Sequence, residues 1–217
     1  MMRILLSLLI IATFISTTNA QDDCALRKNQ EGIKVYLCET EGSPFKTIIV
    51  SFETKGSIKS YASGVLDINN YKSWQVSINH VKILKQISKT ELIYYAEIDA
   101  PWPIEQRDLI FHLKVIQHPV SKKLTVTLKE MPSYMPEQEG IIRIPLAEST
   151  LTVTPITTNH LKVEYILQVN PGGDIPAFIA NMFAANTPWQ TFRNFRNKLE
   201  SNEFDNNNVA EIINYAK

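Results

Sequence analysis

The sequence predicts an α+β fold in which a curved antiparallel sheet wraps around a long C-terminal helix and encloses a hydrophobic cavity. From residue 81 onward, segments in which every second residue is apolar follow one another as strands. Their short connections favour antiparallel hairpins. The last third changes to the apolar spacing of a helix, which is the element large enough to cover the apolar face of the sheet. A sheet curved around a helix leaves an interior gap, and such gaps hold ligands.

The first twenty residues form a separate unit. Arg3 supplies a positive charge, residues 4–15 are almost wholly apolar, and small and polar residues lead to Ala20. This pattern is typical of a signal peptide, and the apolar run is short for a membrane-spanning helix. We expect cleavage near Ala20 and export to a periplasm or through a secretory route; the alternative is an uncleaved N-terminal anchor.

Cys24 and Cys38 are the only cysteines of the chain, and both lie near the expected mature N-terminus. In an oxidising compartment such a pair often forms a disulfide. The bond would tie the entry segment to the first predicted strand. The alternative is two free, half-buried thiols.

The first part of the mature chain is predicted to hold two strands and a helix. Residues 32–39 and 45–55 have the composition of strands, with a turn at residues 42–44 between them. Residues 57–74 place apolar side chains three and four positions apart, which predicts a helix. Ser57 is a suitable N-cap for it.

Six further strands are predicted from residue 81 onward. The clearest alternation runs from Leu161 to Val169, where every second residue is apolar. The predicted strands span residues 81–87, 91–98, 109–117, 124–131, 148–156 and 161–169.

One long helix is predicted in the C-terminal third, after a turn at residues 171–174. Its apolar stripe runs through residues 175–199. Thr187 and Pro188 interrupt the stripe, with Thr187 able to cap a new helix and Pro188 suited to its first position. The Asn-rich segment 201–217 is predicted to be a flexible tail.

Composition restricts the class of function. The 217 residues carry 22 Lys+Arg and 22 Asp+Glu, so the net charge is zero. A general nucleic-acid binder is excluded because there is no basic excess to hold a phosphate backbone. The length suits a single domain, which we place at residues 21–200.

Four features of the sequence resemble the START family of lipid-transfer domains. Residues 100–109, APWPIEQRDL, are similar to the family's PWP…RD signature, and residues 135–143, MPEQEGIIR, to the segment before its central strands. Residues 170–176, NPGGDIP, resemble the entry to its C-terminal helix. Trp74 stands where the family often carries a tryptophan after its first helix. The matches occur in the family's order over residues 45–200.

The resemblance implies a START-like helix-grip fold around a lipid cavity. It implies binding and transfer of a lipid or other hydrophobic ligand, with the C-terminal helix and adjacent loops as the gate. We expect a monomer that contacts membranes transiently, needs no cofactor or metal and binds no nucleic acid. Some sterol-binding members carry a second arginine six residues after that of the RD pair; Leu113 stands there, so a sterol-type polar anchor is not expected. The helix that precedes the first strand in many members is reduced here to residues 24–31.

Two arginines are the polar candidates for ligand binding. Arg107 and Asp108 are adjacent on a strand and point to opposite faces, so we do not expect them to pair. Each is either hydrogen-bonded to fix a loop or reaches a lipid headgroup. A buried Arg143 must meet a carboxylate, a carbonyl or a ligand phosphate, and otherwise forms a surface ion pair. Glu97 and Asp99 are possible partners for either arginine.

Apolar residues of the last helix are core, cavity wall, or both, since the two surfaces coincide in this fold. Burial against such a wall gives affinity at roughly 25 cal/mol per Å², and a few polar groups give selectivity. Trp102 is placed at the cavity mouth or against the helix. The candidate ligand-binding residues are Trp102, Arg107, Leu113, Arg143, Phe178, Met182, Trp189 and Phe192.

Catalysis has little support in the sequence. The four histidines have no metal-ligand spacing, and there is no nucleophile elbow or phosphate-binding loop. Two alternatives remain open. One is a helix-grip enzyme of the cyclase or hydrolase kind, using His112 with Asp108 on the same strand face. The other is a ligand sensor that transports nothing.

Overall fold

The computed structural model describes residues 24–99, 105–205 and 209–215. The predicted signal peptide and Trp102 lie outside these residues. Strands are β1 (Cys24–Gln30), β2 (Ile33–Thr40), β3 (Ser43–Lys55), β4 (Ile78–Ser88), β5 (Glu91–Ile98), β6 (Arg107–Gln117), β7 (Leu124–Glu130), β8 (Ile142–Arg143), β9 (Leu146–Thr157) and β10 (His160–Asn170). Helices are α1 (Ile58–Leu66), the 3-10 helix η1 (Ile68–Ser73), α2 (Ala177–Phe183) and α3 (Asn186–Glu200).

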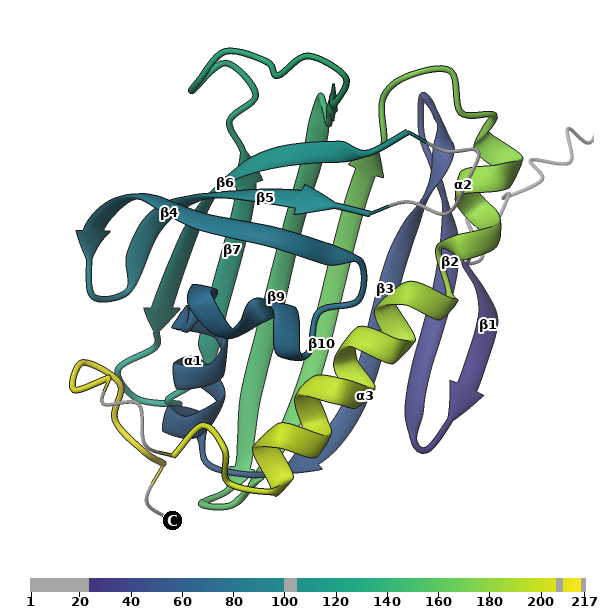
Figure 1. The fold of residues 1–217 in the computed structure, drawn as a ribbon. Coiled ribbons are helices and arrows are strands. Elements are labelled where there is room, and N and C mark those ends of the chain that lie inside the picture. Colours follow the sequence, from purple (N-terminus) through teal and green to yellow (C-terminus); the bar gives the residue numbers. More distant parts are fainter. Residues whose placement is uncertain (1–23, 100–104, 206–208, 216–217) are drawn as a thin grey trace, which may run out of the picture.

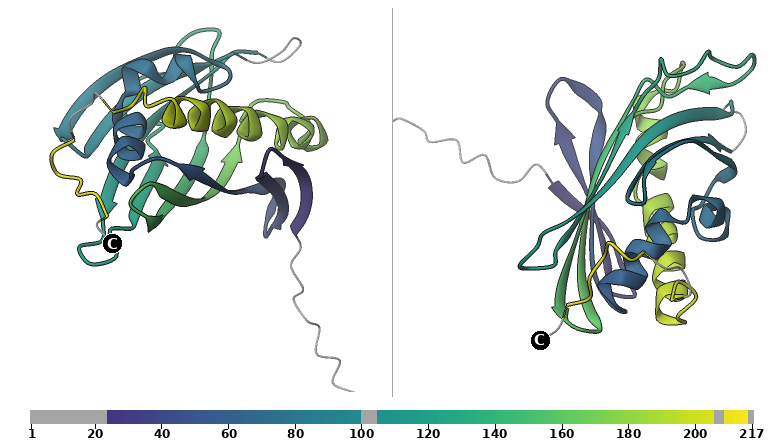
Figure 2. Two further views of the ribbon diagram at one scale, coloured as in Figure 1. Left: turned by 90° about the horizontal axis from the view of Figure 1, so that it is seen from below. Right: turned by 90° about the vertical axis from the view of Figure 1, so that its left-hand side faces the viewer.

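All ten strands belong to one sheet, in the order β1-β2-β3-β10-β9-β7-β6-β5-β4, with β8 added beside β6. The pairings are antiparallel except for the short parallel contact between β6 and β8. The sheet curves, and α1 and α3 lie on its concave side (Figures 1 and 2). The predicted α+β fold is therefore confirmed, and the six strands expected after residue 81 are all present.

Alternation along β10 shows why the sheet has one apolar face. Leu161 and Val163 are fully buried, while the alternating Lys162 and Glu164 are exposed and form an ion pair at 3.0 Å on the outer face. Successive side chains on a strand point to opposite faces, so this sequence fixes which face of β10 meets the core.

Helix α3 packs on the concave face through an aromatic stripe. Trp189, Phe192, Phe195 and Leu199 are buried on one side of the helix. The ring of Phe195 lies 4.7 Å from that of Tyr61 on α1 and 4.8 Å from that of Trp74. Tilted and edge-on ring pairs at such distances add to the stabilisation from burial.

The helix predicted over residues 57–74 is divided. Ser57 caps α1 as expected, because its side chain accepts a hydrogen bond from the Ser60 backbone N–H at 3.0 Å. Asp67 then leaves the helical conformation, and the chain continues as η1. Gly64 lets the helix approach its neighbours closely, since a Cβ there would lie 2.7 Å from the Phe204 ring.

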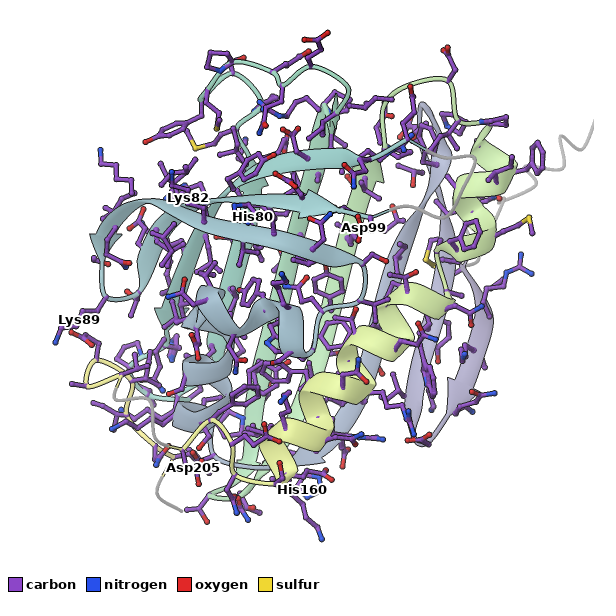
Figure 3. The ribbon with its side chains drawn as sticks, in the orientation of Figure 1. His80, Lys82, Lys89, Asp99, His160 and Asp205 are labelled. Carbon is purple, nitrogen blue, oxygen red and sulfur yellow. A yellow bond between two sulfur atoms is a disulfide. The ribbon has the colours of Figure 1, made fainter. Side chains whose placement is uncertain are left out.

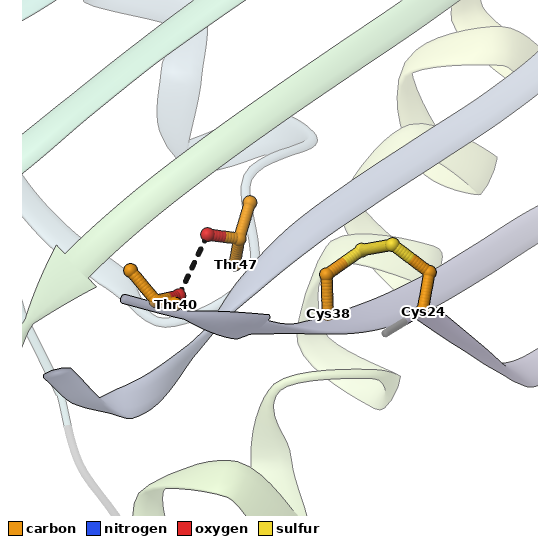
Figure 4. The surroundings of a disulfide bond; sticks show 4 residues. All are labelled: Cys24, Cys38, Thr40 and Thr47. Atoms are coloured by element: carbon orange, nitrogen blue, oxygen red, sulfur yellow. Dashed lines mark hydrogen bonds between the residues drawn. A yellow bond between two sulfur atoms is a disulfide. The ribbon is translucent and has the colours of Figure 1, made fainter. Parts of the chain in front are cut away.

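The N-terminal segment, expected as a helical remnant, is the edge strand β1. Glu31 and Gly32 form the turn to β2 with φ of 52° and 74°, the left-handed conformations that tight hairpin turns require. Cys24 and Cys38 are opposite each other in the β1–β2 register and form a disulfide (Figure 4). The cysteine pairing predicted from the sequence is therefore present in the structure.

The predicted C-terminal helix is two helices. The break falls at Ala184 and Ala185, and α3 has no side-chain N-cap, so the expected capping role of Thr187 is wrong. Pro188 lies in the first turn of α3, where its missing N–H would have had no partner within the helix. Because of this break, α2 is not collinear with α3. It lies near the N-terminal end of β3 (Figure 1).

The described parts of the C-terminal tail, residues 201–205 and 209–215, pack on the domain instead of forming a flexible extension. Phe204, Val209 and Ile212 are buried, and Asp205, labelled in Figure 3, accepts a hydrogen bond from the Ser60 hydroxyl. Three apolar side chains spaced through an Asn-rich segment therefore dock onto the domain. Of the helices described, none is both long and apolar enough to cross a membrane.

Candidate functional site

An apolar cavity of about 420 Å³ lies between the concave face of the sheet and the C-terminal helices. Its walls come from β3, β5, β6, β7, β9 and β10, from α1 and the loop after η1, and from α2 and α3. The volume falls within the range of roughly 300–1,000 Å³ found for small-molecule sites. The cavity is where the curved sheet and the helices fail to meet.

Tyrosine and phenylalanine rings form the inner wall. Tyr94 lies 5.8 Å from Phe111, and Tyr165 lies 5.0 Å from Phe192, between ring centroids. Burial raises the pKa of Tyr165 to about 12 and the pKa of Tyr94 well above its ordinary value. Their hydroxyls are therefore neutral near pH 7, and the wall offers polar groups without charge.

Trp74 also lines the cavity, at the end of η1. Its indole packs edge-on against Tyr71 and Phe195. The indole N–H is buried and has no hydrogen-bond partner among the residues that the structure describes. A buried N–H without a hydrogen-bond partner lowers stability. The packing of Tyr71 and Phe195 around the indole must therefore offset this cost.

Of the residues that the structure describes, three charged ones line the cavity, Lys46, Asp99 and Arg107. Lys46 forms an ion pair with Glu39. Asp99, labelled in Figure 3 at the end of β5, accepts hydrogen bonds from Asn79 at 2.6 Å and Gln106 at 3.1 Å. These two charges are thus matched by neighbouring groups.

Arg107 is held differently. Its side chain is buried, with a residue exposure of 4 %. Nε donates to the backbone oxygen of Pro171 at 3.2 Å, and Nη1 donates to the backbone oxygen of Glu105. Burial is the main cause that lowers the pKa of Arg107. The cation is therefore held by two neutral carbonyls, one in the turn that leads into α2 and one just before β6.

Arg143 lies outside the cavity, on the opposite side of the sheet. It forms a bidentate ion pair with Asp108, and its remaining donors reach the backbone oxygens of Pro132, Met135 and Pro136. Its role is structural, because it fixes the 131–141 loop to β6. As predicted, Arg107 and Asp108 do not pair. Glu97, expected as a possible partner, instead accepts a hydrogen bond from the Tyr95 hydroxyl.

Arg107 and Phe192 are the predicted site residues that line the cavity. Leu113 is fully buried in the core but lies outside the lining. Trp189 is turned to the β1–β2 hairpin, where its indole N–H donates to the Gln30 oxygen at 3.2 Å. The prediction that Leu113 and Trp189 line the cavity is therefore wrong, because both side chains pack against other residues of the protein.

Phe178 and Met182 are also outside the lining, each 67 % exposed. They lie four residues apart and so share one face of α2. Ala180 and Phe183, three residues apart, line the cavity from another face. The expectation for Phe178 and Met182 is corrected because the break before α3 sets the rotation of α2.

Several lining residues were not singled out from the sequence. Tyr94, Tyr165 and Phe111 lie on predicted strands at the positions that alternation assigns to the buried face. Alternation already assigned them to the buried face, but it does not say which buried residues border a cavity rather than the packed core.

His112 is on the outer face of β6, where it is hydrogen-bonded to Glu91 at 2.7 Å. The enzyme alternative, in which His112 would act with Asp108 from the cavity, does not fit this position, because His112 alternates with the buried Phe111 and Leu113. Among residues 24–99, 105–205 and 209–215, no group of three or more potential metal ligands comes together.

A curved sheet closed by C-terminal helices over an apolar cavity defines a helix-grip protein with an internal ligand site. The chain belongs to the START domain family, whose model matches residues 19–203.

Comparison with individual proteins agrees with this assignment. The chain is 29 % identical over 179 residues to an uncharacterised protein from Pseudomonas aeruginosa, covering 82 % of this chain and 88 % of that protein. It is 25 % identical over 170 residues to the phosphatidylcholine transfer protein of Rattus norvegicus, covering 76 % and 78 %. The crystal structure of a STAR-related lipid transfer protein fragment from Xanthomonas axonopodis matches with a TM-score of 0.76 at 31 % identity, covering 82 % and 99 %.

Proposed function

We propose that the protein binds a lipid or another hydrophobic molecule in its cavity and carries it between membranes. The observation that carries this proposal is the apolar cavity of about 420 Å³ enclosed in a START fold. The names of two relatives, a phosphatidylcholine transfer protein and a STAR-related lipid transfer protein, support it. Burying apolar ligand surface at roughly 25 cal/mol per Å² supplies the affinity.

Helix α2 is the gate of this carrier. It has no buried residue, and its side-chain attachment to the sheet is Asn181, which accepts from the Lys46 N–H and donates to the Pro44 oxygen. Gly172 and Gly173, both with positive φ, precede it in a turn. A weakly held helix between a glycine turn and the break at Ala184 can swing outward, as lids of binding sites do.

Helix α3 stays in place while α2 moves. The Glu31 carboxylate in the β1–β2 turn accepts hydrogen bonds from Arg193 at 2.9 Å and from Arg196 at 3.2 Å. Lys28 lies over the Trp189 ring, 4.0 Å from its centroid. The N-terminal hairpin therefore anchors α3, and the gate expected from the sequence narrows from the whole C-terminal helix to α2.

The exposed face of α2 contacts the membrane in this proposal. Phe178 and Met182 expose two-thirds of their surface beside the cavity. Adjacent exposed apolar side chains are unusual on a soluble surface and suit a lipid interface. Insertion of this face would hold α2 open where the ligand enters or leaves.

Export and a monomeric, non-catalytic state complete the proposal. The N-terminal pattern of residues 1–20 and the Cys24–Cys38 disulfide support an oxidising compartment outside the cytosol. The partners in this proposal are the ligand and, transiently, the membrane, and no cofactor is needed because transfer forms and breaks no covalent bond.

A vesicle-to-vesicle transfer assay with fluorescent phosphatidylcholine tests the proposal. Ala184→Trp places a large ring in the cavity wall, so transfer and binding should fall at least tenfold while the protein remains folded. Ala210→Trp, on the exposed tail, is the control and should transfer at the normal rate. Normal transfer by Ala184→Trp contradicts the cavity as the binding site. Binding without transfer in the unmodified protein favours a sensor.

A further inference from the structure

Arg107 is a buried cation at the cavity wall that forms no ion pair with a carboxylate of the described residues. Neither of the two hydrogen bonds that its guanidinium donates within the described residues goes to a charged group, because both acceptors are backbone carbonyls. Glu105 is exposed and contributes through its distant charge and its backbone oxygen, without an ion pair. Within the described ranges, no acidic side chain lies within ion-pair distance of Arg107.

Two other carboxylates near this end of β6 already have hydrogen-bond partners of their own. Asp108 points through the other face of β6 to Arg143, and Asp99 accepts from Asn79 and Gln106. A guanidinium has five N–H donors, and two carbonyl contacts leave Nη2 and one hydrogen of Nη1 without a partner among the described residues. A buried charge whose donors are only partly satisfied is costly, so we expect a group that accepts from the remaining donors.

The turn over Arg107 holds it in one position. Gly173, with φ of +64°, lies so close that an added Cβ would be 3.6 Å from Nη2 and 2.7 Å from Ile142. The Pro171 oxygen holds Nε from the same turn. The guanidinium is thereby fixed before any ligand arrives, and a preorganised donor loses little entropy on binding.

We propose that Arg107 binds an anionic oxygen headgroup, phosphate or carboxylate, of the ligand in the cavity. The ligand is then an amphiphile whose tail fills the apolar wall and whose phosphate or carboxylate accepts from Nη1 and Nη2. Neutral lipids such as diacylglycerols and fatty alcohols leave the cation unsatisfied and bind more weakly. This inference rests on the proposed function and names the ligand class for the same site.

Matched lipid pairs test the inference on the unmodified protein. Binding of dioleoylphosphatidylglycerol is compared with that of dioleoylglycerol, and oleic acid with oleyl alcohol, by native mass spectrometry and by displacement of a fluorescent lipid. At least one anionic member should bind about 10- to 100-fold tighter than its neutral partner, the range expected for hydrogen bonds to a charged group. Discrimination in the first pair identifies phosphate, and in the second carboxylate.

Equal affinities within both pairs overturn the inference while leaving the lipid carrier intact. If none of the four lipids binds, the inference and the proposed function are both overturned. The two failures are thus distinguishable.

Substitution of Arg107 gives a second, independent test. Arg107→Gln keeps N–H donors for a carbonyl but removes the charge, so it should abolish discrimination within the pair while neutral binding remains. Lys162→Gln removes one positive charge from the outer face of β10 and should keep the discrimination. Retained discrimination in Arg107→Gln overturns the inference. If Arg107→Gln does not fold, the comparison of lipid pairs on the unmodified protein still decides the question.

Discussion

Asp108 and Arg143 form a bidentate ion pair on the side of the sheet away from the cavity, with Nε 2.6 Å from Oδ1 and Nη2 3.1 Å from Oδ2. Both side chains are almost wholly buried. Arg107, next to Asp108 on β6, points to the opposite face and has no carboxylate partner among the residues that the structure describes. Adjacent residues on β6 thus have different roles. Asp108 forms a buried ion pair on one face of the sheet, and Arg107 places its charge at the cavity on the other face.

The buried ion pair should make a large contribution to stability when only one partner is removed. Asp108→Asn leaves the Arg143 charge buried and uncompensated, and we expect a loss of about 3–5 kcal/mol in the free energy of unfolding. Urea denaturation measures it. The double variant Asp108→Asn/Arg143→Met should lose less than the sum of the two single variants. A loss below about 1 kcal/mol for Asp108→Asn would show that the pair is dispensable.

The disulfide should stabilise the N-terminal hairpin. Cys24 and Cys38 are 14 residues apart, and closing a loop of this size contributes about 3 kcal/mol by the chain-entropy model. We expect Cys24→Ser/Cys38→Ser to lower the free energy of unfolding by about 2–4 kcal/mol. Denaturation of the unmodified protein with and without a reductant is the matched comparison. Identical urea midpoints in the two conditions would refute this expectation.

The C-terminal tail should matter for stability. Phe204 is fully buried against Phe195, with ring centroids 4.9 Å apart. Phe204→Ala should cost about 3–5 kcal/mol, measured by urea or thermal unfolding. Ile213→Ala, at a side chain 58 % exposed on the same tail, should cost less than about 0.5 kcal/mol. If both variants lower the free energy of unfolding by less than about 0.5 kcal/mol, the tail is flexible as the sequence predicted.

Glu91 should titrate below its ordinary range. The hydrogen bond with His112 lowers the pKa of the Glu91 carboxyl, with a smaller contribution from Lys114. Since the folded pKa is depressed, the stabilisation is present above the unfolded pKa and is lost as pH falls through the folded pKa. NMR titration should show the low pKa in the unmodified protein and a higher one in His112→Ala. An unchanged Glu91 pKa in that variant would contradict the assignment.

Loosening α2 should speed ligand exchange. Asn181→Ala removes the two side-chain hydrogen bonds that tie α2 to β3, at 3.1 and 3.2 Å. At about 0.5–1.5 kcal/mol each, their loss should raise the ligand release rate roughly 5- to 100-fold in a stopped-flow dilution experiment. Gln190→Ala, on the exposed face of α3, is the control. Equal release rates would place the gate elsewhere.

Much of the sheet could be predicted because its information is local. Alternation along β10 or β6 reports which face is buried, and short connections dictate antiparallel pairing. Strand β1 carries no such signal: Cys-Ala-Leu-Arg-Lys-Asn-Gln has two apolar neighbours and four polar residues in a row. It is a strand because β2 offers an edge and the disulfide fixes the register.

The candidate site was predictable only in part for a related reason. Arg107 became a candidate through the resemblance of residues 100–109 to the START signature, and Phe192 through the apolar stripe of the predicted C-terminal helix. Phe178 and Met182 follow the same helical spacing, yet the break at Ala184 turns them outward. The rotation of one helix relative to the next depends on how both pack on the sheet, which periodicity within the helix does not encode.

The central claim is that the cavity holds a lipid-like molecule. The most direct test is native mass spectrometry of the exported, purified protein, followed by identification of organic-extractable material. The account predicts one bound molecule per chain, belonging to a lipid class with a phosphate or carboxylate group. A protein free of bound lipid, which also fails to take one up from vesicles, would contradict it.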